Sequence, residues 1–279
     1  MPPVNLAISC IGWNPSEDVA VADRMAAHGC TGVELVPDRI ATPPLGATPA
    51  QVAAVRAFWE SRGIPVVAMQ ALLFGHPELL VFGETRAQTR DYLAAIIRLG
   101  GALGAKALVF GSPRNRARGL MPADVAQRIA VDFFGELGTI AASAGTCLCI
   151  EPSPPQYGAD FATDSVQALA LVEAVGSPGF GLHLDSACAL LASEDFPTRL
   201  RASAHVLRHV HISEPQLAPV GPGGTADVQA IGVALRSIHY AGYVSIEMRA
   251  AADPLSSARV PEGSLFAVDR ALSHVKAAL

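Results

Sequence analysis

Eight short apolar segments alternate along the chain with longer segments in which apolar residues recur at helical spacing. Strands that alternate with helices pair in parallel through right-handed crossovers, and eight such units close into a (β/α)₈ TIM barrel. The rival fold is a doubly wound open sheet, but no GxGxxG follows the first strand. Because no linker or break in composition divides the chain, we predict a single barrel domain over residues 1–279. The expected strands are Asn5–Cys10, Gly32–Val36, Ile64–Gln70, Lys106–Gly111, Cys147–Glu151, Phe180–Asp185, Leu207–Ser213 and Tyr243–Met248.

The helical segments and loops agree with a barrel. In the third unit, Tyr92, Ile96, Leu99 and Leu103 recur at helical spacing and predict one apolar stripe that lies against the sheet. The loops expected after strands two, four, five and seven are rich in proline and glycine. A barrel carries its active site on loops of this kind at the carboxyl ends of its strands, so we expect the functional residues there.

Four consecutive strands in the second half of the chain end in residues that bind metals: Glu151, Asp185, His211 and Glu247. Together they would carry a charge of −3, so a divalent cation is needed to hold them close to one another. Because carboxylates dominate and no thiolate is present, we expect one Mn²⁺, Mg²⁺ or Co²⁺ ion, with Zn²⁺ as the alternative. Side chains alternate along a strand, and the positions out of phase with these four are apolar: Leu148, Ile150, Leu182, Leu184, Val210, Ile212, Val244 and Ile246.

Further candidates share the inward phase of these strands. His183 and His209 lie two residues before a ligand candidate, where they either orient the carboxylates or contact the substrate. Glu34, on the inward face of the second strand, either contacts the substrate or satisfies buried polar groups. Arg249 follows Glu247 in the same phase and is a candidate substrate contact.

Arg114 and Arg116 stand in the loop expected after the fourth strand. They either bind an anionic group of the substrate or are solvated surface residues.

Composition narrows the function classes. The chain is 51% hydrophobic and 16% charged, which favours a large buried core. Its net charge of −5 gives no basic surface for a nucleic acid, so a small-molecule substrate is expected. The longest apolar region, residues 93–111, is interrupted by Arg98 and Lys106 and does not predict a membrane span. The five cysteines form no CxxC pair, and with no signal peptide in view we expect buried reduced thiols in a cytoplasmic protein.

At these motifs the chain resembles the xylose-isomerase-like sugar isomerases and epimerases, over nearly its full length. The segments that carry the resemblance to ketose 3-epimerases are IEP at Glu151, HLD ending at Asp185, HVHISE around His211 and SIEM at Glu247. ALLFG from Ala71 and LVFGSPRNR from Leu108 are similar to segments of sugar phosphate isomerases/epimerases. The resemblance implies that the four residues bind one metal ion and that Glu151 and Glu247 also transfer protons. It implies a metal-dependent isomerase or epimerase that acts on a small ketose or keto-polyol through an enediolate.

Two positions depart from the family pattern. Cys188 stands where the similar epimerases carry a substrate-binding histidine, and Leu217 stands where they carry an arginine. The resemblance therefore carries over the metal and proton chemistry but not the sugar contacts. A lyase that dehydrates a keto-inositol is the alternative, followed by a DNA-repair enzyme like endonuclease IV, which the acidic charge disfavours, and by a non-catalytic sugar-binding barrel. Dimers are common among such barrels, so a homodimer is a further expectation.

Overall fold

Eight parallel strands form a closed barrel in the computed structural model, which describes residues 4–249 and 263–279. Each strand pairs with the next one in the chain, and β8 pairs with β1 to close the sheet. The predicted (β/α)₈ barrel is therefore confirmed, and the doubly wound sheet is excluded. The strands are β1 (Asn5–Ser9), β2 (Gly32–Leu35), β3 (Val66–Met69), β4 (Ala107–Phe110), β5 (Leu148–Ile150), β6 (Phe180–Asp185), β7 (Leu207–Ser213) and β8 (Tyr243–Glu247).

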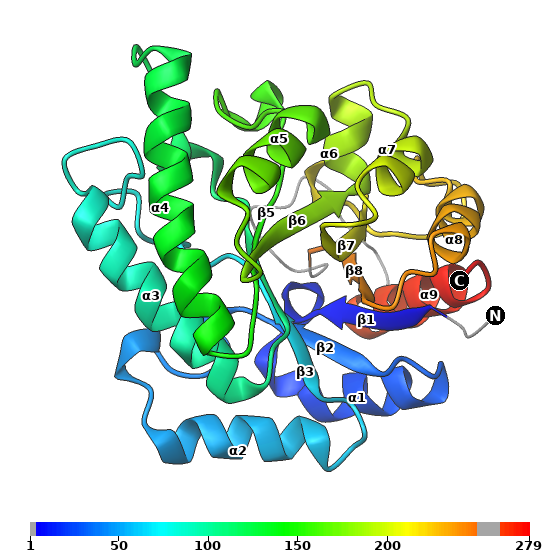
Figure 1. Cartoon of the computed structure of the whole chain (residues 1–279). Coiled ribbons are helices and arrows are strands. Elements are labelled where there is room, and N and C mark those ends of the chain that lie inside the picture. Colours follow the sequence, from blue (N-terminus) through cyan, green and yellow to red (C-terminus); the bar gives the residue numbers. More distant parts are fainter. Residues whose placement is uncertain (1–3, 250–262) are drawn as a thin grey trace.

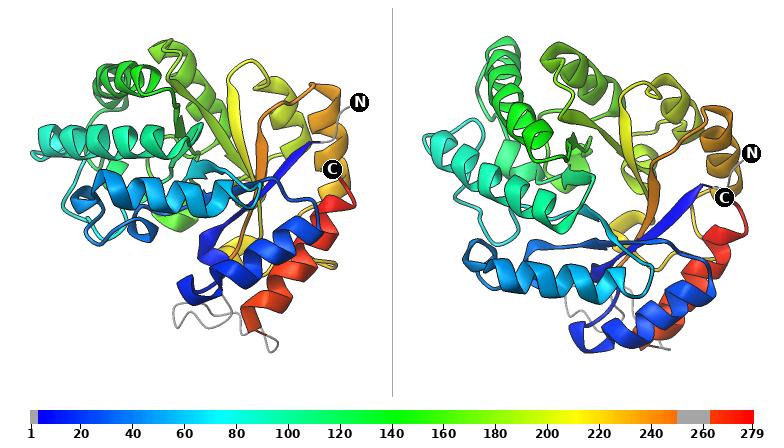
Figure 2. Two further views of the ribbon diagram at one scale, coloured as in Figure 1. Left: turned by 90° about the horizontal axis from the view of Figure 1, so that it is seen from below. Right: turned by 60° about the horizontal axis from the view of Figure 1, so that its bottom comes forward.

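The α-helices surround this sheet as an outer layer (Figure 1). In both further views α9 lies beside α1, close to the start of β1, so the last helix completes the ring next to the first (Figure 2). Among the described residues, no helix combines the length and the apolar character that crossing a bilayer requires. The helices are α1 (Asp18–Ala27), α2 (Pro49–Glu60), α3 (Arg86–Leu103), α4 (Ala123–Ser143), α5 (Ser165–Val175), α6 (Ser186–Leu191), α7 (Phe196–Ala202), α8 (Val228–Ser237) and α9 (Gly263–Lys276).

Successive side chains on the strands alternate between the layer under the helices and the interior of the barrel, as the sequence predicts. The apolar residues that alternate with the ligand candidates on β5 to β8, such as Leu148 and Val244, are fully buried in the main apolar core. The polar residues of the other phase, His209 and His211 among them, are buried as well, and His211 is paired there with Glu34 of β2. The barrel thus carries an apolar layer under its helices and, in this half, a polar interior.

The predicted stripe on α3 is correct in position but rotated slightly. Ile96 and Leu103 are fully buried, whereas Tyr92 and Leu99 are only partly buried at the edge of the core. The centre of the buried face is formed by Leu93, Ile97 and Gly100. A Cβ atom on Gly100 would stand 2.5 Å from the side chain of Leu108 on β4, so glycine allows the helix to approach the sheet here.

Candidate metal centre and active site

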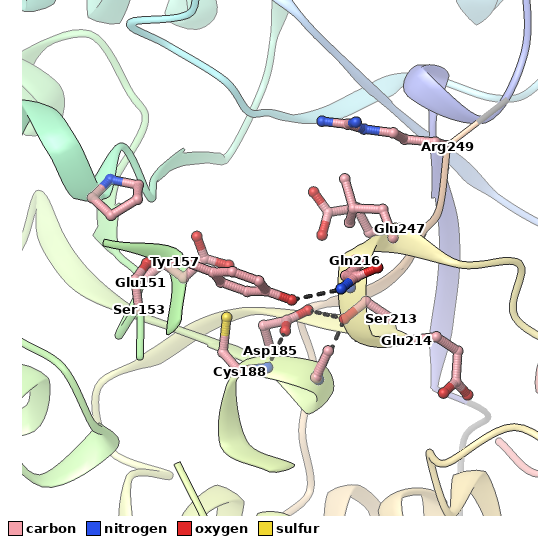
Figure 3. A pocket seen from close by; sticks show the side chains of 13 residues that line it. Glu151, Ser153, Tyr157, Asp185, Cys188, Ser213, Glu214, Gln216, Glu247 and Arg249 are labelled. Atoms are coloured by element: carbon pink, nitrogen blue, oxygen red, sulfur yellow. Dashed lines mark hydrogen bonds between the residues drawn. The ribbon is translucent and has the colours of Figure 1, made fainter. Parts of the chain in front are cut away.

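A cavity of about 500 Å³ opens at the carboxyl ends of the strands, within the size range of small-molecule sites. Glu151, Asp185 and Glu247 line it, so three of the four predicted ligands border the same space. Figure 3 shows Asp185 and Cys188 on one side of this space, with Glu247 and Arg249 on another. The other residues that line it are Pro113, Ser153, Tyr157, Ala187, Ser213, Glu214, Gln216 and Leu217.

The structure brings all four predicted ligands together in overlapping groups. The ligand atoms of Asp185, His211 and Glu247 lie within 4.8 Å of one another, and Glu151 belongs to similar groups with His211 and with Asp185. Glu151 and Glu247 share no such group, because β6 and β7 separate the strands that carry them. The two glutamates therefore approach the cavity from different sides, with Asp185 and His211 between them.

Asp185 is both a ligand candidate and the N-cap of α6. Its Oδ1 accepts a hydrogen bond of 2.7 Å from the backbone N–H of Cys188, and its Oδ2 accepts one from the Ser213 hydroxyl. Burial raises the pKa of Asp185 to about 7, and the negative charges of Glu247 and Glu151 add to this effect. A cation would remove that penalty, because it would favour the ionised carboxylate.

The imidazole of His211 is paired with the buried carboxylate of Glu34. Its Nε2 lies 2.9 Å from Oε2 of Glu34, which also accepts a hydrogen bond of 2.7 Å from Ser245. Its Nδ1 lies 3.4 Å from Oε2 of Glu247 and has no hydrogen-bond partner among the described residues. Burial lowers the pKa of His211, but Glu34 and Glu247 outweigh it and raise that pKa well above its ordinary value.

This arrangement fits a bound divalent cation. A carboxylate that accepts the proton of one imidazole nitrogen leaves the other nitrogen free to bind a metal, which is the usual support of a metal-bound histidine. His211 meets this condition, since Glu34 faces Nε2 and the partnerless Nδ1 faces the acidic cavity. With three carboxylates beside it, the donor set suits Mn²⁺, Co²⁺, Mg²⁺ or Zn²⁺.

Glu34 is buried inside the barrel and does not line the cavity in which a substrate would bind. Its side chain is 0% exposed and lies under His211 and His209, away from the cavity. Burial alone would raise the pKa of Glu34, but the two imidazoles outweigh it and hold that pKa well below the usual carboxyl value. Of the two readings of the sequence, only the satisfaction of buried polar groups fits this position.

Glu151 packs against Gly111 and the buried His183. Oε2 is so close to Gly111 that a Cβ there would stand 2.2 Å from it, so the glycine after β4 makes room for the carboxylate. Oε1 lies 3.5 Å from Nε2 of His183. Burial raises the pKa of Glu151, against the opposing effect of His211 and of Arg116.

The three candidate arginines differ in their exposure and in whether they line the cavity. Arg114 is exposed and lines neither cavity at the barrel mouth. Arg116, two residues later, is 0% exposed, and its guanidinium has no hydrogen-bond partner in the described part of the chain, so surface solvation is wrong for this residue. Burial lowers the pKa of Arg116 to about 10, while the charge of Glu151 opposes that shift. Arg249 lines the cavity, as a substrate contact requires.

A family model described as the xylose isomerase-like TIM barrel matches residues 22–265. The chain belongs to this family. Among curated proteins, no sequence matches it significantly.

Solved structures with the same barrel cover almost the whole chain at low sequence identity. A D-psicose 3-epimerase from Clostridium cellulolyticum H10 has a TM-score of 0.82 at 15% identity and covers 99% of both chains. A 3-keto-D-glucoside 4-epimerase from E. coli has a TM-score of 0.74 at 17% identity and covers 96% of this chain and 97% of its own. The IolI protein, whose structure contains a zinc atom, has a TM-score of 0.74 at 18% identity and covers 99% of each. These likenesses show a shared fold.

The two departures from the family's epimerase pattern both line the cavity. Burial raises the pKa of the Cys188 thiol well above its ordinary value, and the carboxylate of Asp185 adds to this, so the group is neutral. Leu217 stands in the loop after β7, where it and Gln216 adopt positive φ angles of 57° and 60°. Such angles are uncommon for residues other than glycine, so the packing of this loop must hold them.

Sequence reasoning missed the residues that shape the loops around the site. The backbone N–H of Gln216 donates to the hydroxyl of Tyr157, which joins the loops after β5 and β7 (Figure 3). Glu214 accepts hydrogen bonds from the backbone N–H groups of Thr225 and Ala226 and fixes the loop before α8. No strand phase could have revealed these residues, because they follow the regular part of each strand.

A second cavity of about 280 Å³ adjoins the first at the ends of β1, β2 and β3. Leu217, Glu247 and Arg249 line both cavities. The remaining lining is Ile11, Val36, Pro37, Asp38, Gln70, Ala71 and Phe74. The mouth of the barrel therefore has an acidic half and a more apolar half.

Proposed function

We propose that the protein is a divalent-metal-dependent isomerase or epimerase that acts on a small ketose or keto-polyol. The observation that supports this most directly is the placement of Glu151 and Glu247 at one cavity on either side of Asp185 and the free Nδ1 of His211. A pair of carboxylates around a cation at the mouth of a barrel is suited to moving a carbon-bound proton.

Each residue takes a defined part in this proposal. Asp185, His211, Glu151 and Glu247 hold the metal, which when bound supplies the positive charge that stabilises an enediolate. One of the two glutamates removes the proton next to the carbonyl carbon, and the other returns a proton from its own side. Return on the opposite face inverts the carbon, whereas return by the same base to the neighbouring carbon interconverts aldose and ketose.

Two further residues support these groups. Glu34 keeps the Nδ1 face of His211 directed toward the cavity and is a positioning residue. Arg249 lies beside Glu247 at the rim, where we expect it to contact a substrate hydroxyl or carbonyl group. We assign no substrate contact to Arg114, since it is exposed and borders neither cavity.

Solvent proton exchange tests the proposal. The protein, loaded in turn with Mn²⁺, Co²⁺, Mg²⁺ and Zn²⁺, is incubated in D₂O with a panel of ketoses and keto-polyols and followed by NMR. We expect deuterium to enter the carbon next to the carbonyl, and EDTA to stop this. Release of an unsaturated product instead would identify the lyase, and silence across the panel with stoichiometric metal bound would refute enediolate chemistry. Glu151→Gln should abolish the exchange, whereas the exposed Glu84→Gln serves as the matched control.

A further inference from the structure

His183 is a fully buried histidine whose two ring nitrogens have no hydrogen-bond partner among the described residues. Buried polar groups without a partner are rare in folded proteins and cost about 1–3 kcal/mol each. Because the side chain is 0% exposed, it does not reach the open cavity, so a direct substrate contact does not supply the partner. The expectation of a substrate contact at this residue therefore does not fit its position.

His183 lies close to two residues that could bind a metal, Glu151 and His211. It lies two residues before Asp185 on β6, so both side chains point inward. Its Nε2 is 3.5 Å from Oε1 of Glu151, and the ligand atoms of His183, Glu151 and His211 all lie within 4.8 Å of one another. Donors that share one ion at about 2.1 Å stand no more than about 4.2 Å apart. The 3.5 Å between Glu151 and His183 lies within that limit, whereas the group with His211 is defined by the wider 4.8 Å.

His209 offers a contrast on the neighbouring strand. It pairs with His183 in the register of β6 and β7 and is equally buried. Its close group consists of Glu34 and His211, and its Nε2 lies 3.6 Å from Oε1 of Glu34. His209 thus faces the buried carboxylate under the site, whereas His183 faces the carboxylate that lines the cavity.

We propose that Nε2 of His183 is a fifth protein ligand of the metal, beside Glu151, Asp185, His211 and Glu247. This inference rests on the proposed metal site and adds a second imidazole to it. A fifth protein donor would leave fewer positions of a bound ion open to substrate oxygens. A second nitrogen donor also shifts the preference of the site from Mg²⁺ toward Co²⁺ and Zn²⁺.

Counting bound nitrogens tests this ligand without an activity assay. Pulsed EPR of the Mn²⁺-loaded protein should detect two imidazole nitrogens in the wild type and in His209→Gln, but one in His183→Gln. We also expect His183→Gln to lower the ratio of Co²⁺ to Mg²⁺ affinity about tenfold by calorimetry, with His209→Gln near the wild-type ratio. A single imidazole in the wild type refutes the inference while leaving the metal site intact, whereas failure to bind any divalent ion refutes the proposed function itself.

The second cavity supports an independent inference about the substrate. Phe74 borders it and is 72% exposed, so its ring offers apolar surface at the edge of this space. The turn that presents it is fixed, since the N–H of Phe74 donates to the carbonyl of Ala71, which has a φ of 56°. Ile11, Val36 and Pro37 add to the apolar lining of this cavity, which Asp38 and Gln70 also border.

The second cavity is continuous with the first, and this limits which part of a substrate it can bind. Glu247 borders both spaces, so a substrate carbon that reacts at Glu247 directs its substituents into one or the other. The first cavity of about 500 Å³ by itself has the volume of a small-molecule site. The second space is therefore additional room, and its apolar residues suit a group without hydroxyls.

We infer that the substrate carries an apolar or aromatic substituent next to its keto-polyol part, as in a keto-glycoside, and that this substituent binds between Phe74 and Leu217. Aromatic side chains contribute most of their binding energy by covering apolar surface, so removal of the Phe74 ring should weaken binding of the substituent alone. The inference rests on the proposed function and names the class of its substrate.

Matched ligands that differ only in the substituent test it. The probes are the methyl and phenyl glycosides of 3-keto-glucose, titrated into the Mn²⁺-loaded protein by calorimetry. We expect the phenyl glycoside to bind about tenfold more tightly, and Phe74→Ala to remove that difference. Leu120→Ala, which truncates another exposed apolar side chain outside both cavities, should leave it unchanged.

Equal affinity for the two glycosides, a preference that survives Phe74→Ala, or no binding of either probe would overturn the assignment. Deuterium exchange with free ketoses in the same preparations would still occur if only the subsite is wrong. Its absence would instead count against the proposed function.

Discussion

The mouth of the barrel has two halves built on the same kind of strand but with different chemistry. The ends of β5 to β8 carry Glu151, Asp185, His211 and Glu247, supported from inside the barrel by buried histidines and Glu34. The ends of β1 to β3 present mostly apolar residues, with Phe74 exposed to solvent. One half is thus arranged to hold charge and move protons, and the other to select what is attached to the reacting group.

The difference follows from where water is excluded. In the acidic half, burial raises the pKa of Asp185 to about 7 and brings like charges close together, which is unfavourable until a cation is bound. In the apolar half, exposed apolar surface is unfavourable until a ligand covers it. The acidic half therefore needs a cation and the apolar half needs a ligand. Substitutions in one half should affect metal binding and proton transfer, and substitutions in the other should affect substrate binding.

The largest effect is expected from the proton-transfer pair. Glu247→Gln keeps the shape of the side chain but removes its charge and its ability to take up a proton. Deuterium exchange should fall about 10²–10⁴-fold at saturating metal, as is typical when a general acid or base is lost. NMR in D₂O measures this rate, and an unchanged rate would mean that the acidic half does not perform the chemistry.

Metal binding should stabilise the protein more strongly at pH 8 than at pH 6. Because the pKa of Asp185 is raised in the folded state, an unfolded chain loses that proton first as pH rises from about 4 to 7, and the metal-free protein loses stability over this window. At pH 8 a bound cation offsets the ionised cluster, whereas at pH 6 protons compete with it. Scanning calorimetry with and without Mn²⁺ measures the shift in Tm.

Asp185→Asn provides the control for this pH effect. The variant should show a smaller metal-induced shift and a smaller difference between the two pH values, because only His211 and Glu151, whose pKa values are also raised, still bind protons in competition with the metal. A wild-type shift that is larger at pH 6 than at pH 8 would contradict the assignment of Asp185.

Loss of the Glu34 carboxylate, which faces His211, should lower activity and metal affinity less than loss of a metal ligand does. Glu34→Gln leaves all ligands in place but removes the charge that faces Nε2 of His211. We expect Mn²⁺ affinity to fall about 10–100-fold, the usual effect of losing a carboxylate behind a metal-bound histidine. Calorimetric titration measures it, with Ser245→Ala, which removes one neighbour of Glu34, expected to change the affinity less.

The smallest effect is expected at Arg114. Since this side chain is exposed and borders neither cavity, Arg114→Ala should change the free energy of unfolding by no more than about 0.5 kcal/mol. Mn²⁺ affinity and deuterium exchange should stay within about twofold of the wild type. A large loss of exchange would mean that the loop after β4 contacts the substrate. The site would then not be confined to these two halves.

The strands and the inward phase of the ligand candidates could be read from the chain because both depend on a local rule. Successive side chains on a strand point to opposite faces, so polar and apolar residues must alternate wherever one face meets the helices. Strand ends do not follow from this rule, and β3 spans Val66–Met69 rather than the predicted Ile64–Gln70. The ladder stops where the chain turns away, which alternation does not encode.

The sequence by itself therefore determined the barrel and the four residues at the ends of β5 to β8, since alternation and strand order need no knowledge of distance. Only the tertiary structure decided which neighbours these residues have. It placed Glu34 of β2 under His211 of β7, left His183 beside Glu151 without a hydrogen-bond partner among the described residues, and buried Arg116 while exposing Arg114. These outcomes depend on contacts between strands and loops distant in the chain, which closure of the barrel fixes.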